Sequence, residues 1–299
     1  MNFYKKIFKS QKLRFKILSA LRFISDESML KLQYFIKCGR KLNLNNPQRY
    51  TEKIQWYKLN YRNPVMQQCC DKYAVREYVK LKGLEHILND LYAVYDSPEH
   101  ISFDTLPDEF VSKLSNGSST NILVDNKLNH NLEHVKQRFR DFISQSSTSA
   151  GREWCYITDK TPVIVAERYM KDPDQNNMIY DYKFLCFNGV PHYVVLDTDR
   201  FSDHRRNIYD MSWNNLHISS DCPCSTSEYP RPDTMDEMID IAKILSAGFP
   251  AVRIDLYSVQ GKVYFGEMTF FPWSGYVIFN PDSFDYELGA LFELPEKNN

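Results

Sequence analysis

The segment 251–270 carries charged side chains in a pattern that could bind a metal ion together with phosphate. Arg253 and Asp255 alternate with apolar residues, and Glu267 lies beyond a Gln260-Gly261 pair that suits a turn. Alternate residues of a β-strand project from one face, so the pattern predicts one apolar and one charged face. Two carboxylates and a guanidinium on a half-buried face suit Mg2+ ions that bridge phosphate oxygens. A salt-bridge ladder on the surface of a sheet has the same pattern.

The relative position of these side chains depends on the hairpin turn. A three-residue turn from Val259 to Gly261, with Gly261 left-handed, places Arg253 opposite Glu267 and Asp255 diagonal to it. A two-residue Gln260-Gly261 turn separates them instead. On the returning strand, we expect a single face to carry Val263, Phe265, Glu267 and Thr269.

A second candidate phosphate site begins at Lys113, which ends an apolar strand. The polar loop 116–120, Asn-Gly-Ser-Ser-Thr, follows it. Backbone amides of such a loop can surround a phosphate that the lysine also reaches. An ordinary hairpin turn looks the same. The loop is not a P-loop, and the chain has no GxGxxG, so the common nucleotide-binding motifs are absent.

The elements that would position these residues combine helices with antiparallel strands, which indicates an α+β fold. Helices are predicted over 51–59, from Asp71 as N-cap to a stop at Gly83, over 129–145, and from Asp233 as N-cap to about residue 247. Strands are predicted over 91–96, on both sides of the loop within 108–124, over 162–170, and in two hairpins, 181–197 with an Asn188-Gly189 turn and 251–270.

Composition is that of a globular enzyme of one large domain or two lobes. The 299 residues are 43% hydrophobic and 25% charged, which excludes a disordered chain. No apolar stretch approaches a membrane span or a signal peptide, so we expect a cytoplasmic protein. The seven cysteines are odd in number and none forms a CxxC pair, which favours reduced thiols over a disulfide framework or a zinc site.

The charge is distributed unevenly along the chain. Residues 1–40 hold ten Lys or Arg against two acidic residues, whereas the whole chain has a net charge of −1. Within residues 1–25, basic and apolar side chains occupy different faces of a predicted helix. That helix suits either an anionic membrane surface or packing on the protein with its basic face in solvent. Nucleic acid is disfavoured because the remainder of the chain is acidic.

Several longer segments resemble the TupA-like ATP-grasp family of teichuronopeptide and surface-polysaccharide biosynthesis. The resemblance covers about residues 40–290. It rests on the order Lys72, Lys113 with its loop, VIVAERYM, Asp255 and Glu267, and on the blocks NPQRYTEKIQWYKL, RNPVMQQCCDKYAVREYV, GREW, YDYKFLCFNG, DTDRF, VRIDLY and YFGEMTF. It implies an α+β ATP-grasp fold in which two α+β lobes clasp ATP, with a helical basic N-terminal extension. The implied division is residues 1–62 for the extension, 63–165 for the small lobe with the phosphate loop, and 166–290 for the lobe with the metal site.

The resemblance also implies roles for individual residues. ATP and Mg2+ are the implied cofactors, with Asp255 and Glu267 as metal ligands. Arg253 and Lys113 are the implied catalytic residues, Arg253 stabilising the charge of an acyl phosphate. The implied nucleotide-binding residues are Lys72, Lys113, Asn116, Gly117, Ser118, Ser119, Glu167, Arg168, Tyr169 and Lys183. Glu167 begins the segment expected to be the hinge between the lobes.

Two segments depart from the family pattern. The loop reads SNGSST where the family has a pattern like NHGSGG, which loses a histidine and two glycines. Thr269 stands where ATP-grasp enzymes usually have an asparagine as third metal ligand. We therefore expect coordination by Asp255 and Glu267, and expect the segment 272–275 to shape the acceptor site.

Further residues could contact the substrates. Arg200 and Arg205 suit the carboxylate of a uronic acid, although an exposed basic loop looks the same. Trp154 suits either a sugar platform or the core. The expected substrate residues are Arg152, Trp154, Asp181, Arg200, Arg205, Ser274 and Gly275.

The function that the resemblance implies is ATP-dependent amide ligation. The enzyme would join an amino acid or other amine to a carboxylated sugar, or a glycan that carries one, in a capsule, O-antigen or related polysaccharide, at the inner face of the membrane. One alternative is a glycosyltransferase that uses Asp197-Thr198-Asp199 as a DxD motif. Another is a scaffold that binds nucleotide without turnover, which the altered loop would suit.

Overall fold

The computed structural model describes residues 21, 23–146, 151–158, 161–175, 177–198 and 204–298. The basic helix predicted within residues 1–25 lies almost entirely outside the described residues, as does Arg200. Among the residues described, no helix is both long and apolar enough to cross a membrane. All seven cysteines are free thiols, as expected.

The chain begins with a group of short helices. They are α3 (Asp26–Cys38), α4 (Tyr50–Asn60), α5 (Pro64–Cys70), α6 (Val75–Leu81) and the 3-10 turn η1 (Glu85–Ile87). The helix predicted from Asp71 starts four residues later, because Asp71 instead caps a turn and accepts hydrogen bonds from the amides of Tyr73 and Ala74. Gly83, with a φ of 76°, follows the end of α6 as predicted.

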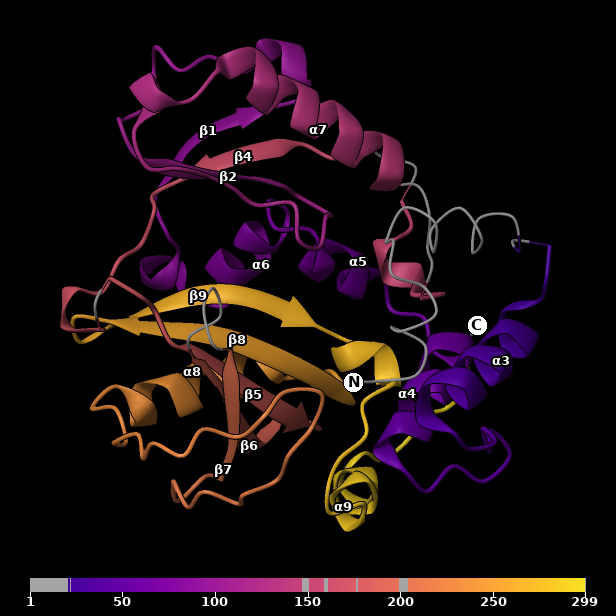
Figure 1. Cartoon of the computed structure of the whole chain (residues 1–299). Helices are drawn as coiled ribbons and strands as arrows, with labels where there is room; N and C mark the ends of the chain where they lie inside the picture. Colours follow the sequence, from indigo (N-terminus) through magenta and orange to yellow (C-terminus); the bar gives the residue numbers. More distant parts are fainter. Residues whose placement is uncertain are drawn as a thin grey trace.

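The smaller sheet has the strand order β1-β4-β2-β3, with every pair antiparallel. Its strands are β1 (Leu91–Tyr95), β2 (Phe110–Leu114), β3 (Ile122–Val124) and β4 (Ile164–Glu167). Helix α7 (Leu132–Ser146) lies along this sheet (Figure 1) and contributes Val135 and Phe139 to an apolar cluster with Phe110 and Leu114. The loop 116–120 joins β2 to β3, which confirms the predicted strand-loop-strand arrangement. The short 3-10 turns η2 (Pro98–His100), η3 (Lys127–Asn129), η4 (Trp154–Tyr156) and η5 (Pro173–Gln175) lie in the connections.

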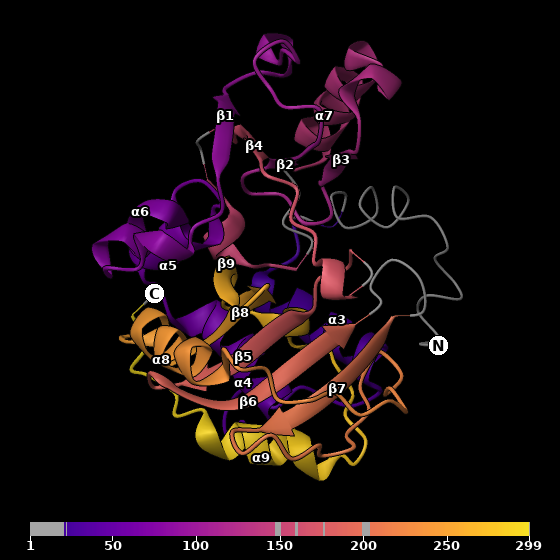
Figure 2. The same cartoon turned by 90° about the vertical axis from the view of Figure 1, so that its left-hand side faces the viewer.

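The larger sheet has the order β7-β6-β5-β8-β9 and is also antiparallel. Its strands are β5 (Asp181–Phe187), β6 (Val190–Thr198), β7 (Arg205–Asp210), β8 (Ala251–Val259) and β9 (Lys262–Thr269). Phe187 pairs with Val190, so the predicted two-residue turn at Asn188-Gly189 is confirmed. In Figure 2 the larger sheet lies in the lower half of the molecule, with the small sheet above it.

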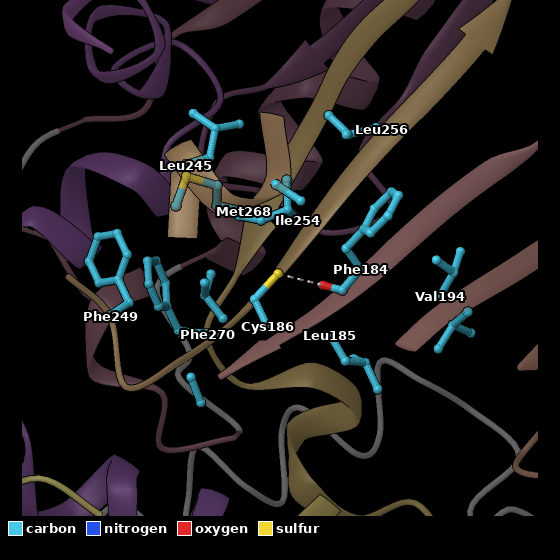
Figure 3. Close-up of a cluster of buried hydrophobic side chains, with 14 of the residues drawn as sticks. Phe184, Leu185, Cys186, Val194, Leu245, Phe249, Ile254, Leu256, Met268 and Phe270 are labelled. Carbon is cyan, nitrogen blue, oxygen red and sulfur yellow. Dashed lines mark hydrogen bonds between the residues drawn. The ribbon is translucent and has the colours of Figure 1, made fainter. Parts of the chain in front are cut away.

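One face of the larger sheet is apolar and packs on α8 (Met235–Ser246). Figure 3 shows Phe184, Ile254 and Met268 from three strands meeting Leu245 of the helix. Helix α8 begins after Thr234 with no side-chain cap, so Asp233 is not its N-cap as predicted. The charged side chains of the same strands lie on the opposite face of the sheet.

The N-terminal helices are packed against the end of the chain. The 3-10 turn η6 (Pro272–Gly275) follows β9, and α9 (Ser283–Leu291) packs on α4. Asp285 of α9 accepts hydrogen bonds from the amide and hydroxyl of Thr51, at 2.9 and 2.8 Å. Helix α4 is therefore joined to the C-terminal part of the chain, and the division into residues 1–62, 63–165 and 166–290 stays a prediction.

Candidate active site

The β8–β9 hairpin turns at Gln260 and Gly261, with φ values of 50° and 71°. Val259 pairs with Lys262, so the turn has two residues and the three-residue turn is wrong. The register then shifts between Leu256, which pairs with Phe265, and Asp255, which pairs with Glu267. Gly266 is the extra residue in β9, which makes a β-bulge.

The bulge decides which side chains share the charged face. A regular ladder from this turn would pair Asp255 with Gly266 and rotate Glu267 to the face covered by α8. With the bulge, Phe265 stays in the core at 8% exposure while Glu267 and Thr269 lie beside Asp255 and Arg253. The predicted common face of Phe265 and Glu267 is therefore wrong. Asp255 and Glu267 lie opposite each other because of the bulge, since the two-residue turn alone would not pair them.

Arg253 joins the two carboxylates. Its Nε donates to Asp255 Oδ1 at 2.6 Å, and its Nη2 donates to Asp255 Oδ2 at 2.7 Å and to Glu267 Oε1 at 3.0 Å. Nη2 also reaches Thr269 Oγ1 at 3.1 Å, and that hydroxyl donates to Glu267 Oε1. Thr269 is thus engaged with Arg253 and Glu267. Bidentate pairing of this kind fixes both the arginine and the carboxylate.

The two carboxylates differ in their protonation behaviour. Burial raises the pKa of Asp255 to about 6, against the charges of Arg253 and Lys183. Burial also opposes ionisation of Glu267, but Arg253, Lys72 and Lys183 lower its pKa to about 2. The Glu267 side chain is 43% exposed, whereas that of Asp255 is 2% exposed. Glu267 is therefore the ionised and accessible member of the pair.

A ladder of alternating charges continues across the sheet from Asp255. Lys183 Nζ donates to Asp255 Oδ2 at 2.9 Å and to Asp181, and it lies 3.8 Å from Asp197 Oδ2. Arg206 then binds Asp197 through Nε and Nη2, at 2.6 and 3.1 Å. We call this set the charge ladder: its members are Glu267, Arg253, Asp255, Lys183, Asp181, Asp197, Arg206 and, through Arg206, Asp221. It connects β9 to β7, and sequence reasoning did not predict its Arg206 end as part of the metal-binding face.

Lys72 and the loop 116–120 meet at the β9 side of this ladder. The Lys72 amide donates to Ser115 O at 2.7 Å, and Lys72 Nζ donates to Gly117 O at 2.6 Å. Burial and the neighbouring Lys113 lower the pKa of Lys72, while Glu267 opposes that change. Within the described part of the chain no carboxylate forms an ion pair with Lys72. The buried Oδ1 of Asn116 likewise has no hydrogen-bond partner among the described residues.

Lys113 is arranged differently from Lys72. Its Nζ lies 2.6 Å from Glu167 Oε2, and Arg76 Nη1 lies 3.5 Å from Glu167 Oε1. Glu167 is 5% exposed at the end of β4. The two residues expected to contact ATP thus contact each other, and Arg76 of α6 is a neighbour that the sequence did not single out. Ser118 and Ser119 are exposed at the tip of the loop, where Ser119 has a φ of 59°.

The TupA-like ATP-grasp family model matches residues 52–293. The chain belongs to this family. Membership confirms the family predicted from the sequence blocks and identifies the two-sheet arrangement as an ATP-grasp fold. Each of the two sheets carries helices, which matches the predicted pair of α+β lobes. No curated protein matches the chain.

Solved ligase structures align with this ATP-grasp protein at low identity. D-alanine–D-alanine ligase from Bacillus anthracis complexed with ATP gives a TM-score of 0.43 and 14% identity, over 75% of this chain and 63% of that chain. The Helicobacter pylori enzyme gives 0.41 and 15%, over 76% and 61%. The ATP-grasp ligase PsnB with Mg and ADP gives 0.40 and 12%, over 82% and 66%. The chain thus spans less than two thirds of the length of these three ligases.

The residues of this ATP-grasp protein fit ATP with Mg2+. Magnesium is usually held by one or two carboxylates together with phosphate oxygens and water. Asp255 and Glu267 supply two such carboxylates, and no group of three or more His, Cys, Asp or Glu in the described residues could hold a metal by itself. Lys72 supplies a buried cation without a carboxylate partner among the described residues. Two carboxylates leave most coordination positions of Mg2+ unfilled, and the phosphate oxygens of ATP would fill some of them.

The segment after β4 connects the small sheet to β9. Arg168 lies 5.1 Å from the ring centre of Tyr264 in β9 and 3.3 Å from Asp90. Tyr169 has the Lys171 ammonium 5.0 Å from its ring centre. The contact of Arg168 with Tyr264 thus joins this segment to the larger sheet. The hinge predicted here stays a prediction.

The expected substrate residues fall into separate groups. Arg152 pairs with Asp26 of α3 at 2.6 Å, and the buried Nε1 of Trp154 has no partner among the described residues. Ser274 and Gly275 lie in η6, while Asp181 belongs to the charge ladder. Arg205 begins β7 beside that ladder, so the structure does not gather the predicted residues in one place. Asp197 is 2% exposed and ion-paired with Arg206, and Asp199, the other acidic residue of the DxD triplet, lies outside the described residues.

Proposed function

We propose that this protein is an ATP-dependent carboxylate–amine ligase. It would join an amine or amino acid to a carboxylated sugar of a capsule, O-antigen or related surface polysaccharide, through an acyl phosphate. The observation that supports this most directly is the placement of Asp255 opposite Glu267, bridged by Arg253, with the charge of Lys72 acting on Glu267. Family membership supports the ligase class, and the sugar and the amine are inferred from the family resemblance.

The first chemical step transfers the γ-phosphoryl group of ATP to the substrate carboxylate. A carboxylate oxygen forms a bond to γ-phosphorus, and ADP leaves. Asp255 and Glu267 would hold Mg2+, which would supply positive charge to the phosphate oxygens. Lys72 neutralises charge on the transferred group from its position at the loop, and Lys113 adds to it from β2.

The second step forms the amide. The amine bonds to the acyl carbon, phosphate leaves, and the amine loses a proton to solvent or to a basic group. Arg253 lies between the two metal-binding carboxylates, where its guanidinium can stabilise negative charge on the acyl phosphate and its tetrahedral successor. Glu167, Arg168 and Tyr169 would bind the nucleoside part of ATP at the connection between the sheets. Lys183, which was expected to bind the nucleotide, instead donates a hydrogen bond to Asp255 and would hold that carboxylate in place.

The basic N-terminus suits a location at the inner face of the membrane. The seven Lys or Arg of residues 1–25 face no acidic residue in that segment, so anionic lipid would attract it. Deleting residues 1–25 should move the protein from sedimenting anionic vesicles to the supernatant. Unchanged sedimentation would remove the membrane contact from the proposal.

The test of the ligase proposal is a thermal-shift titration with ATP, ADP and a uridine-diphosphate hexuronate, each with and without Mg2+. A ligand that binds the native state raises the melting temperature. We expect ATP with Mg2+ to stabilise the wild type, and Asp255→Asn to lose the dependence on Mg2+. Asp221→Asn is the matched control, because it removes a carboxylate from the far end of the same charge ladder.

The three possible results of the titration lead to different conclusions. Retained Mg2+ dependence in Asp255→Asn would remove Asp255 from the metal site. Stabilisation by the sugar nucleotide alone would replace the ligase proposal with a glycosyltransferase. Stabilisation by ATP in the expected pattern would justify screening amines for ADP release.

A further inference from the structure

The turn after β9 has an unusual backbone. Trp273, Ser274 and Gly275 have successive φ values of 52°, 55° and 65°. This left-handed region is accessible to glycine but unfavourable for tryptophan and serine. A Cβ on Gly275 would overlap Gln55 and Ile54 of α4. Two adjacent non-glycine residues in this conformation require contacts that hold them there, and such strain is often retained at functional sites.

Two side chains of α4 supply those contacts. Gln55 Nε2 donates to Ser274 O at 3.0 Å and to Gly275 O at 2.9 Å. Lys58 Nζ donates to Ser274 O and to Ser274 Oγ, both at 2.9 Å, and to Gly151 O at 3.0 Å. The carbonyl groups of a left-handed turn point away from regular hydrogen-bonding partners, and three of these five bonds go to the carbonyl groups of Ser274 and Gly275.

Burial of the Lys58 ammonium costs free energy. Its side chain is 0% exposed, and burial lowers its pKa to about 8 although Glu153 lies 3.5 Å away. A buried cation is normally retained only where it is hydrogen-bonded or paired. Ser274 Oγ donates to Glu153, so Lys58, Ser274 and Glu153 form a closed network between α4, η6 and the segment 151–158.

The turn carries Trp273 to the end of the charge ladder. The Arg206 guanidinium lies 5.6 Å from the centre of the Trp273 ring, and Phe279 supports the ring edge-on at 5.7 Å. From Arg206 the ladder runs through Asp197 and Lys183 to Asp255, the proposed metal ligand. The turn therefore contacts the Arg206 end of the charge ladder, whereas Glu267 lies at its other end.

The same network presents groups that suit a carbohydrate. An aromatic ring accepts the apolar face of a sugar, and the groups around it must exchange hydrogen bonds with hydroxyls. Ser274 Oγ and Glu153 supply such groups, and Trp154, next to Glu153, has a buried Nε1 donor without a partner among the described residues.

We propose that Lys58 and Gln55 are positioning residues that hold the 273–275 turn as one wall of the site for a carboxylated sugar. This rests on the proposed function, which supplies the sugar substrate. Neither residue touches the substrate. They act through the turn, because four hydrogen bonds from α4 hold Ser274 and Gly275 next to Trp273, which lies against Arg206.

The test compares Lys58→Met with Lys53→Met in the full-length protein. Lys53 lies in the same helix and also donates to two backbone carbonyls, those of Gly289 and Phe292, but it does not contact the turn. The probes are uridine-diphosphate glucuronate and free glucuronate, measured by calorimetry with ADP and Mg2+ present. We expect Lys58→Met to weaken binding of the better probe about tenfold, with ATP affinity within about twofold of wild type. Lys53→Met should leave both affinities unchanged.

A second readout follows the turn itself. Hydrogen exchange of the Ser274 and Tyr276 amides, which donate to Phe271 O and Trp273 O, should accelerate in Lys58→Met and not in Lys53→Met. Gln55→Leu gives the same comparison if Lys58→Met does not fold. Unchanged exchange and unchanged sugar affinity would overturn the proposal, as would an equal loss of ATP and sugar affinity.

The test separates this proposal from the ligase proposal. If the wild type binds ATP but neither glucuronate probe, the sugar wall is overturned while the ligase reading stands. If the wild type fails to bind ATP, the ligase proposal fails, and accelerated exchange at the turn would still establish Lys58 as the residue that holds it.

Discussion

Asp255 lies opposite Glu267 because Gly266 is an extra residue in β9. The hairpin turn has two residues, and a regular ladder from such a turn would have paired Asp255 with Gly266. The extra residue of the bulge shifts the register of β9 by one position. Glu267 therefore returns to the face of the sheet that carries Asp255 and Arg253. The proposed metal site thus depends on a glycine that contributes no side chain.

Gly266→Ala should disrupt this face. A Cβ at Gly266 would lie 2.8 Å from Asp255 O. That oxygen is a backbone atom of β8 and cannot rotate away as a side chain could. We expect the free energy of unfolding to fall by about 1–3 kcal/mol, as for other overpacked sites, measured by urea denaturation. We also expect the Mg2+ dependence of ATP binding to weaken, because the substitution moves Glu267 relative to Asp255.

The control is Gly261→Ala in the turn of the same hairpin. Gly261 has a φ of 71°, so alanine is strained there, but no atom lies within 4 Å of its Cβ. It should lose about 1 kcal/mol of stability and keep its Mg2+ dependence. Equal effects on Mg2+ dependence in the two variants would mean that the bulge does not position the metal site.

Lys72→Met should separate stability from binding. Burial of an ammonium without a carboxylate partner costs stability, and the hydrogen bond to Gly117 O offsets part of that cost. We expect the free energy of unfolding to stay within about 1 kcal/mol of wild type or to rise. ATP affinity should fall about tenfold or more, measured by calorimetry. A large loss of stability with unchanged ATP affinity would assign Lys72 a structural role.

Glu167→Gln should destabilise the small sheet. Glu167 is 5% exposed between Lys113 and Arg76, whose side chains are 18% and 16% exposed. Loss of this carboxylate leaves two mostly buried cations without their partner, which costs about 2–4 kcal/mol in urea denaturation. Glu99→Gln removes a carboxylate from the exposed pair with Arg140 and should change stability much less than Glu167→Gln, because solvent screens that pair. Similar costs for the two variants would contradict the burial argument.

Stability should depend on pH through Asp197. Burial opposes its ionisation, but Arg206, Lys183 and His204 lower its pKa from 3.8 to about 2. The unfolded state therefore binds more protons than the native state between these values, so the stabilisation is present above pH 3.8 and is lost as pH falls toward 2. It amounts to about 2 kcal/mol at neutral pH.

The measurement is the free energy of unfolding of wild type and Asp197→Asn between pH 7 and pH 3. The difference between the two proteins should be constant above about pH 5 and should narrow at lower pH. A difference that does not change with pH would show that Asp197 acts through packing rather than through its charge.

The sequence by itself determined the local features and the family. Asn188-Gly189 predicted a two-residue hairpin because both positions favour left-handed backbone, and alternation along 251–257 predicted one apolar and one charged face. The long sequence blocks predicted the ATP-grasp family, which the family model confirms. These inferences rest on residues close together in the chain, where periodicity and turn chemistry carry the information.

Tertiary structure decided the register and the partners. The bulge at Gly266 depends on packing Phe265 into the core while Glu267 faces away, which no local pattern specifies. The Lys113–Glu167 pair and the Lys58–Ser274 network join residues 54 and 216 positions apart. Such contacts form only when separate elements pack, since a lysine has the same local sequence signal whether it is exposed, paired or buried. The charges were visible in the sequence, but burial and distance, which set their pKa values and roles, came from the fold.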